Sequence, residues 1–407
     1  MRRLEDYYDI VSDEVISNIY RKARKLYGIN VLHVNSTYQG GGVAELLNSL
    51  IPLFNDVGVE TEWSILHGNP DFFSITKKFH NALQGDDIDL TKIKREIYMD
   101  TNQSFSVFNH INHSCVIIHD PQPLPMIKFY QKDQPWIWRC HIDLSHPNEE
   151  LWNFLKRFII QYDLYVVSSD KYKRKGFPLD NQVFAPAIDP ITIKNKEISE
   201  KDIKKYLKKF DIPTDKPIIT QISRFDKWKD PLGVLDVYKR VRKEVDCRLI
   251  LCGSMATDDP EGIEIYEEMR SKAEELIEDK EVILITEENH MLVNVLQRIS
   301  DVVIQKSIRE GFGLTVTEAL WKEKPVVASD VGGISLQIKD GVNGFLCKPN
   351  DNETFARRTV EILKDKKLAN KLGKAAKETV RKKFLTTRLL SNYLDLLSNT
   401  IMDECYK

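Results

Sequence analysis

The stretch that decides the fold lies in the second half of the chain and runs Val302-Val303-Ile304-Gln305-Lys306-Ser307-Ile308-Arg309-Glu310-Gly311-Phe312-Gly313-Leu314-Thr315-Val316-Thr317-Glu318. The run 302–305 is mostly β-branched and predicts a buried strand. The Gly-Phe-Gly turn at 311–313 then leads into a segment that predicts a helix from about Leu314. A strand, a glycine turn and a helix in this order are typical of an α/β protein with a parallel sheet.

The same alternation of short apolar runs and amphipathic segments continues in both directions from this stretch. Further strands are predicted at 29–34, 60–66, 115–119, 136–140, 164–168, 218–223, 248–251, 282–285 and 326–328. Helices are predicted at 43–55, 149–160, 231–243, 261–277, 291–298 and 385–402. The polar, lysine-rich stretch 194–217 between the two series favours an interdomain connection. The sequence therefore predicts two Rossmann-like domains that face each other across a cleft.

The length of the chain agrees with two domains. It has 407 residues, and a single core seldom grows beyond about 250–300 residues. We expect an N-terminal domain over 1–200, completed by a C-terminal helix within 385–407, and a C-terminal domain over 201–384. The helix is expected to return to the first domain because its apolar residues share one face, namely Leu389, Leu390, Tyr393, Leu394, Leu397 and Ile401.

Charge, hydropathy and cysteine spacing exclude several classes of protein. With 59 Lys and Arg against 61 Asp and Glu, no overall field attracts nucleic acid or anionic lipid. No window approaches the roughly 18 apolar residues of a membrane-spanning helix, and the N-terminus does not resemble a signal peptide. The six cysteines lack the spacing of a zinc site or a disulfide framework, so we expect reduced buried thiols and a cytoplasmic protein.

Ligand-binding residues should follow the strands, because ligands bind at the carboxyl ends of parallel strands. After the strand at 218–223 come Arg224 and Lys229, two cations suited to a diphosphate, although a solvated basic loop has the same composition. After the first strand, Gln39-Gly40-Gly41-Gly42 opens a helix, where backbone N–H groups can approach a phosphate or a sugar. A simple tight turn would explain these glycines equally well.

The stretch 302–318 holds the strongest candidates. Gly313 belongs to the turn, and the N–H groups of Leu314 and Thr315 lie in the first helical turn, where backbone donors lack partners within the helix. Glu310 precedes this turn and Glu318 lies one turn inside the helix. The two carboxylates are therefore predicted to lie on either side of an anion bound at the helix start.

In the first half, His141 and Asp143 follow the strand at 136–140 and are placed to hydrogen-bond sugar hydroxyls. A histidine in such a position is also common as a structural residue. Asn35, near the end of the first strand, and Asp120 or Gln122, after the strand at 115–119, are further polar candidates for a binding pocket. No metal site is predicted, because the histidines near 110–119 lack suitably spaced partners.

Taken together, these motifs resemble those of the retaining glycosyltransferases of family 4, which have the GT-B fold. Glu310 and Glu318 match the E-x7-E motif of that family, and Arg224 and Lys229 match its basic pair. The glycine loop near residue 41 and Val331-Gly332-Gly333 also fall where the family has them, and the resemblance extends over about 30–400.

The resemblance implies a role for each candidate. Arg224 and Lys229 would hold the donor diphosphate, Glu318 the ribose, and Glu310 the hydroxyls of the donor sugar, which His141 would also reach. Asp143, Gln122 and Asn35 would serve the acceptor. The remaining donor-side residues would be Gly41, Gly42, Gly313, Leu314, Thr315 and Val293.

The stretches 136–148 and 291–297 are similar to the trehalose-forming branch of this family. The resemblance implies that glucose passes reversibly, with retention, from UDP- or ADP-glucose to free glucose, giving α,α-trehalose. It implies front-face attack without an enzymic nucleophile, and no required metal, with Mg²⁺ at most assisting nucleotide release. The expected partners are the nucleotide sugar and glucose or trehalose, without nucleic acid or membrane, and a homodimer is left open.

Three other functions are compatible with the same residues. A trehalose phosphorylase would place inorganic phosphate where the diphosphate binds and would need no ribose contact. Another family 4 enzyme would use a different sugar acceptor, or a lipid at a membrane. A sugar-nucleotide binding protein would show no turnover. The sequence does not decide the base, the physiological direction, or glucose against glucose phosphate as acceptor.

Overall fold

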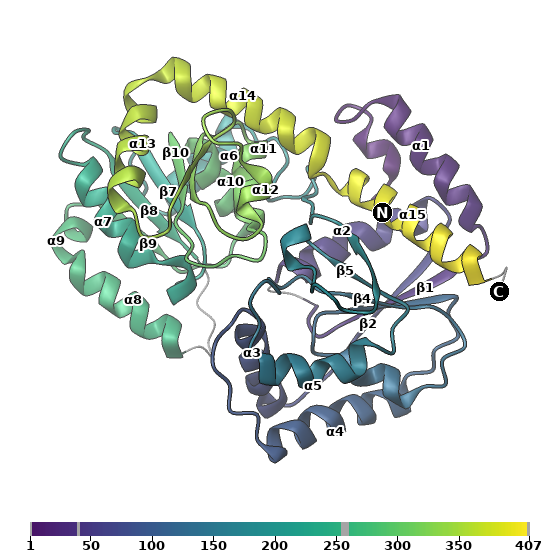
Figure 1. Ribbon diagram of the computed structural model, residues 1–407. Helices are drawn as coiled ribbons and strands as arrows, with labels where there is room; N and C mark the ends of the chain where they lie inside the picture. The colour runs from purple at the N-terminus through teal and green to yellow at the C-terminus, as the bar shows by residue number, and fades with distance from the viewer. Residues whose placement is uncertain (1, 39–40, 254–259, 405–407) are drawn as a thin grey trace. The chain divides into compact units, whose positions relative to one another are not determined.

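The computed structural model describes residues 2–38, 41–253 and 260–404. The chain forms two compact units, residues 1–187 with 386–407, and residues 188–385 (Figure 1). The division thus falls before residue 188 rather than after residue 200 as the sequence suggested. The physical reason is that Asn294 and Arg298 donate hydrogen bonds to the carbonyls of Ile193 and Lys196, which attaches this segment to the second unit.

The predicted interdomain connection at 194–217 was therefore wrong. Residues Glu200–Lys209 form helix α6 inside the second unit. Its Tyr206 and Leu207 pack against that unit's apolar core. The lysines that suggested a linker instead form the solvated face of an amphipathic helix.

The first unit contains a six-stranded sheet whose neighbouring strands are all parallel. The strand order is β2-β1-β3-β4-β5-β6, so the direction of winding reverses between β1 and β3. The strands are β1 Asn30–Asn35, β2 Glu60–Ile65, β3 Cys115–His119, β4 Trp136–Arg139, β5 Leu164–Val167 and β6 Asp180–Val183.

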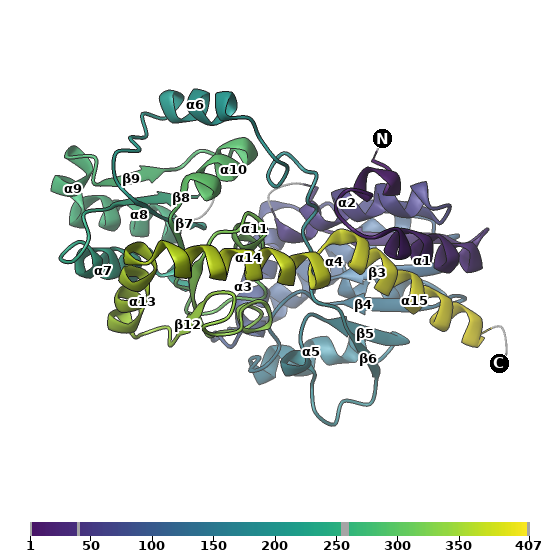
Figure 2. The same cartoon turned by 90° about the horizontal axis from the view of Figure 1, so that it is seen from above.

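Helices cover both faces of this sheet. Alternate strand residues such as Leu32 and Val116 form one core with α3, α4 and α5, whereas α15 packs against α1 and α2 (Figures 1 and 2). The C-terminal helix returns to the first unit, as predicted. The elements are η1 Leu4–Tyr7, α1 Asp13–Ala23, η2 Arg24–Leu26, α2 Gly42–Asp56, α3 Pro70–Leu83, α4 Lys92–Phe108, η3 Leu124–Phe129, α5 Glu149–Ile159, η4 Asp170–Tyr172 and α15 Thr386–Glu404.

The second unit repeats this plan with a different order of strands. Its parallel sheet runs β12-β11-β10-β7-β8-β9, and the winding reverses between β10 and β7. The strands are β7 Ile218–Ile222, β8 Arg248–Cys252, β9 Val282–Ile285, β10 Val302–Gln305, β11 Val326–Ser329 and β12 Phe345–Cys347. The helices besides α6 are η5 Lys227–Lys229, α7 Pro231–Val241, α8 Pro260–Lys272, α9 Glu274–Glu278, α10 His290–Ile299, α11 Leu314–Trp321, α12 Ile334–Gln337, α13 Asn352–Lys364 and α14 Lys366–Lys383.

Two parallel, helix-covered sheets confirm the predicted pair of Rossmann-like domains. The point where winding reverses decides where ligands bind, because the loops that leave the two central strands diverge there and expose the strand ends. In the second unit these are the loops after β7 and β10, and in the first unit the loops after β1 and β3. Six of the candidate residues lie in these loops, namely Gly41, Gln122, Arg224, Lys229, Glu310 and Gly313.

The state of the cysteines and the hydropathy of the helices can be given for the described residues. Five cysteines are free and buried, namely Cys115, Cys140, Cys247, Cys252 and Cys347, whereas Cys405 lies outside the described residues. Among the helices in the described ranges, none combines the length and hydropathy that spanning a bilayer requires.

Candidate active site

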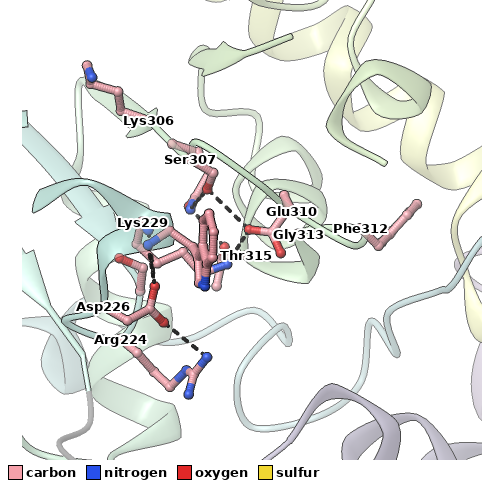
Figure 3. Close-up of polar contacts among 12 residues, drawn as sticks. Arg224, Asp226, Lys229, Lys306, Ser307, Glu310, Phe312, Gly313 and Thr315 are labelled. Carbon is pink, nitrogen blue, oxygen red and sulfur yellow. Dashed lines mark hydrogen bonds and ion pairs between the residues drawn. The ribbon is translucent and has the colours of Figure 1, made fainter. Parts of the chain in front are cut away.

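The loop after β7 is held by the carboxylate of Asp226. It accepts hydrogen bonds from the backbone N–H groups of Trp228 (3.0 Å) and Lys229 (3.1 Å), which caps the short helix η5. The same carboxylate lies 3.0 Å from Nη2 of Arg224, whose side chain remains 55% exposed (Figure 3). Asp226 therefore fixes the loop that presents both predicted cations.

The loop after β10 brings Glu310 to Lys229. Nζ of Lys229 lies 2.5 Å from Oε2 of Glu310, and the two side chains are only 16% and 12% exposed. Ser307 donates a hydrogen bond from Oγ to the same carboxylate oxygen at 3.2 Å (Figure 3). The structure thus joins two candidates from different loops in one sheltered ion pair.

The turn between Glu310 and α11 depends on glycine. Gly313 has φ +82°, and a Cβ there would lie 3.2 Å from Cγ of Glu310. Gln337 donates to the carbonyl of Phe312 at 2.6 Å and closes the turn from the other side. The N-cap residue of α11 is Gly313, which has no side chain to cap the helix. The N–H groups at the start of α11 therefore place the positive end of the helix dipole beside Glu310.

Glu318 lies inside α11 and is almost fully buried. Its carboxylate is 3.5 Å from Nε2 of Gln297 and 3.6 Å from Nζ of Lys194. Burial lowers the pKa of neighbouring Lys322 to about 7, although the negative charge of Glu318 opposes that shift. The contacts of the Glu318 carboxylate with Gln297 and Lys194 both come from its own unit. The binding of ribose by Glu318 stays a prediction.

Sequence reasoning missed a second layer beneath the Lys229 loop. Lys306 is buried and forms an ion pair with Asp230, the residue that caps α7. Gln221 accepts a hydrogen bond from the backbone N–H of Lys306 (2.9 Å) and donates one to the carbonyl of Lys229 (2.9 Å). These residues tie the two loops together. A lysine directly after a buried strand and an aspartate directly before Pro231 were the available signals.

In the first unit, His141 is fixed at both its backbone and its ring. Its backbone N–H donates to Asp120 at 2.7 Å, and its Nε2 lies 3.0 Å from Nδ1 of His119. Burial raises the pKa of the Asp120 carboxyl to about 6, against the opposing effects of this hydrogen bond and of Arg139. Asp120 adopts φ +61°, a conformation that aspartate tolerates better than most residues. Within the described ranges, no group of three or more His, Cys, Asp or Glu side chains is placed to hold a metal ion.

The other first-unit candidates make local hydrogen bonds. The Asp143 carboxylate accepts from the Ser145 hydroxyl at 2.6 Å. Asn35 accepts from Nε1 of Trp63 at 2.7 Å, and the backbone carbonyl of Gln122 accepts from the Asn102 amide at 3.0 Å. All three residues therefore make hydrogen bonds within the first unit, and their role toward an acceptor stays a prediction.

The glycine-rich loop and Val293 complete the donor-side candidates. Gly41 caps α2 and Gly42 begins it, whereas Gln39 and Gly40 lie outside the described residues. Val293 lies on α10 and packs against an apolar cluster of the second unit. The structure thus collects the candidates in two groups, one in each unit.

This architecture and the second-unit site define a class, the GT-B glycosyltransferases. Residues 202–379 match the family described as glycosyl transferases group 1. The α,α-trehalose-phosphate synthase (UDP-forming) of Burkholderia xenovorans, solved in complex with glucose-6-phosphate, superposes with a TM-score of 0.73. The match covers 91% of this chain and 100% of that one at 11% identity, so it bears on the fold alone.

Sequence comparison shows which family of GT-B glycosyltransferases the chain resembles. Residues 33–174 match the N-terminal domain of trehalose synthase. The trehalose synthase of Thermococcus litoralis is 46% identical over 402 residues, which are 98% of this chain and 97% of that protein. The chain belongs to the trehalose synthase family and is a glycosyltransferase. The trehalose phosphorylase of Grifola frondosa is 30% identical over 427 residues, covering 93% of this chain but 58% of that protein.

Proposed function

We propose that this protein transfers glucose, with retention, from a nucleoside-diphosphate glucose to the anomeric hydroxyl of free glucose, forming α,α-trehalose reversibly. The observation that carries the proposal is the convergence of Lys229, Glu310 and the start of α11 at the point where the second sheet reverses its winding. A cation, a carboxylate and a helix N-terminus together suit the junction between a diphosphate and a sugar.

Each group has a distinct task in the transfer. The diphosphate gains negative charge as the glycosidic bond breaks, and Arg224, Lys229 and the N–H groups of Leu314 and Thr315 stabilise that charge. Glu310 accepts hydrogen bonds from the sugar hydroxyls and orients the ring. The acceptor hydroxyl attacks from the face that the diphosphate leaves, and its proton passes to the departing phosphate oxygen. Retention follows without an enzymic nucleophile.

The remaining contacts are assigned by the chemistry of the side chains. Glu318 accepts from the ribose hydroxyls, and His141 reaches the donor sugar. Asp143, Gln122 and Asn35 serve the acceptor with neutral or anionic groups, which favours a free sugar over a sugar phosphate. No metal is required, because cations of the chain neutralise the leaving group, and Mg²⁺ at most assists release of the nucleotide.

The test is to incubate purified protein with glucose and, in parallel, UDP-, ADP- and GDP-glucose, and to identify the product by NMR. We expect α,α-trehalose together with the free nucleoside diphosphate. Glucose 6-phosphate in place of glucose distinguishes the two acceptors. A disaccharide with another linkage would contradict the proposal.

Two further outcomes separate the alternatives. Trehalose and inorganic phosphate yielding glucose 1-phosphate, with no reaction from any nucleotide sugar, would identify a phosphorylase, the activity named for the Grifola frondosa relative. Binding of a nucleotide sugar without product from any acceptor would identify a binding protein. Glu310→Gln serves as the control for contaminating activity, because it should abolish product while leaving the fold intact.

A further inference from the structure

Three histidines form a hydrogen-bonded chain across the centre of the first sheet. Nδ1 of His33, on β1, lies 2.9 Å from Nε2 of His119, at the end of β3. Nδ1 of His119 lies 3.0 Å from Nε2 of His141, which follows β4. Successive rings are nearly parallel, with interplanar angles of 24° and 16°. His33 and His119 are fully buried, whereas His141 is partly exposed.

All three rings are neutral near pH 7. Burial lowers the pKa of His33 to about 3. It also lowers the pKa of His119 and of His141 well below the ordinary histidine value, and the positive charge of Arg139 adds to both shifts. The carboxyl of Asp120 accepts a hydrogen bond from the backbone N–H of His141. Each imidazole therefore has one N–H and one bare nitrogen.

Neutral rings in this arrangement allow only two proton patterns. If His119 carries its proton on Nδ1, it donates to Nε2 of His141, so the proton of His141 must be on Nδ1 and that of His33 on Nδ1. If His119 carries its proton on Nε2, every proton moves to the other nitrogen. The tautomer of His141 is thereby coupled to that of His33, although their rings do not touch.

The inner end of the chain decides between the two patterns. Nε2 of His33 is buried and has no hydrogen-bond partner among the described residues. The His33 ring packs beside the rings of Phe54 and Tyr393, at centroid distances of 6.1 and 6.0 Å. A buried N–H without an acceptor is among the rarest features of folded proteins. Burial raises the pKa of the neighbouring Tyr393 hydroxyl, and the positive charges of Arg139 and Arg388 oppose that shift. Two cations therefore act at this end of the chain of histidines, which favours a lone pair there.

We propose that His33 and His119 are positioning residues that hold His141 in its Nδ1–H tautomer. Nδ1 of His141, at the exposed end of the three histidines, is then a hydrogen-bond donor. We expect it to donate to an oxygen of the bound sugar. This last step rests on the proposed function, whereas the tautomer follows from the three rings and from the buried Nε2 of His33, which has no partner in the described part of the chain. The bare Nε2 of His141 is meanwhile satisfied by His119, so the ring can neither flip nor change its donor.

The tautomer can be measured directly in the full chain. Protein labelled with ¹⁵N-histidine, examined by long-range ¹H–¹⁵N NMR at pH 7.5, should show protonated Nδ1 and bare Nε2 for His33, His119 and His141. Signals are assigned from single variants such as His33→Asn. Protonated Nε2 on His141 would overturn the proposal, whatever the activity of the protein.

Variants of His119 test the positioning role. His119→Gln can accept from His33 and donate to His141, so it should keep the His141 tautomer and stay within about twofold of wild-type kcat/KM. His119→Phe cannot donate, and should give mixed tautomers at His141 with kcat/KM about tenfold lower. His113→Gln removes a histidine that precedes β3 and contacts Glu62, and is the control.

The outcomes distinguish this inference from the proposed function. Equal activity of His119→Phe, His119→Gln and wild type would refute the positioning role. If the tautomer is Nδ1–H but the protein makes no trehalose, the proton pattern of the chain stands and the proposed function fails. If His119→Phe alone misfolds, the tautomer of His141 in wild type and in His119→Gln still tests the proposal, because His119→Gln retains the hydrogen bonds.

Discussion

Nζ of Lys229 lies 2.5 Å from Oε2 of Glu310, although the two residues come from loops 81 positions apart in the sequence. Sequence reasoning assigned them to different parts of one donor, the diphosphate and the sugar. Their contact is consistent with both assignments, since the two parts of the donor are joined by a single bond. Each charge also offsets the desolvation of the other, which lets both remain in a sheltered site.

Replacing Glu310 with alanine should separate turnover from nucleotide binding. We expect kcat to fall about 100-fold or more, because the sugar loses the carboxylate that orients it. The affinity for the free nucleoside diphosphate should stay equal or increase, because Lys229 no longer has a competing counter-charge. Steady-state kinetics and titration calorimetry measure the two quantities.

The control for this variant is Glu361→Ala, which removes a carboxylate that contacts Arg358 on α13. It should change neither quantity. A loss of nucleoside diphosphate affinity as large as the loss of turnover in Glu310→Ala would contradict the role assigned to Glu310.

A methyl group at Gly313 should displace the side chain of Glu310. The new Cβ would lie 3.2 Å from Cγ of Glu310 and 3.4 Å from Cγ1 of Ile334, at φ +82°. We expect Gly313→Ala to cost about 1–2 kcal/mol in stability and to lower kcat about tenfold through the displaced carboxylate. Thermal unfolding and kinetics check both effects.

Gly341 offers a matched comparison for Gly313. It has φ +70°, and no atom of the described residues lies within 4 Å of the position that a Cβ would take. Gly341→Ala therefore carries a similar backbone strain without a steric contact. The two variants should lose similar stability, and only Gly313→Ala should lose activity. Similar losses of activity in both would show that strain, rather than the position of Glu310, is responsible.

Much of the fold followed from the sequence because its central strands are buried on both faces. The predicted strands at 115–119 and 302–305 match the central strands β3 and β10 in full, and the apolar run at 282–285 matches β9 at a sheet edge. The strands that were missed lie at the sheet edges. β6 has the sequence Asp-Asn-Gln-Val, with no apolar run, and β12 has three residues. The helix predicted over 261–277 is divided into α8 and α9.

Less of the site could be predicted, because its contacts join distant loops. Arg224, Lys229 and Glu310 were found by residue type and position after a strand. Two ion pairs depend on which strands are neighbours in the sheet, namely Lys229 with Glu310 and Lys306 with Asp230. The sequences of β10 and β7 do not show that these two strands lie side by side. Likewise, His33 and His119 acquire partners only once β1 and β3 are paired.

Replacing Glu318 tests whether its carboxylate binds the ribose of the nucleotide sugar. If its carboxylate binds ribose, Glu318→Ala should lower the affinity for the nucleotide sugar about tenfold or more while leaving the affinity for inorganic phosphate unchanged. Because the residue is buried beside Lys194, Glu318→Gln keeps the volume and should show a smaller loss in the same direction. Calorimetry with the nucleotide sugar and with phosphate measures both. An unchanged affinity for the nucleotide sugar in a folded variant would exclude the ribose contact and favour a phosphorylase.

The last prediction concerns Asp120 and the pH dependence of stability. Burial raises its pKa to about 6 in the folded protein, from an ordinary value of 3.8. Between these values the folded protein holds a proton that the unfolded chain has released. The contribution of this group to stability is therefore largest at low pH and is lost as the pH rises through 6.

Asp120→Asn isolates this contribution, because the amide keeps an oxygen that can accept from the N–H of His141 but does not titrate. The free energy of unfolding of wild type minus that of Asp120→Asn should fall by about 2 kcal/mol between pH 4 and 7 and stay constant above, which allows for partial access of water to the carboxyl. Urea denaturation followed by fluorescence at each pH measures the difference. The pH effects of all other groups cancel in this difference. A difference that is flat or rises with pH would show that Asp120 is already ionised at pH 4. A carboxylate, rather than a neutral acid, would then accept the hydrogen bond from the backbone of His141.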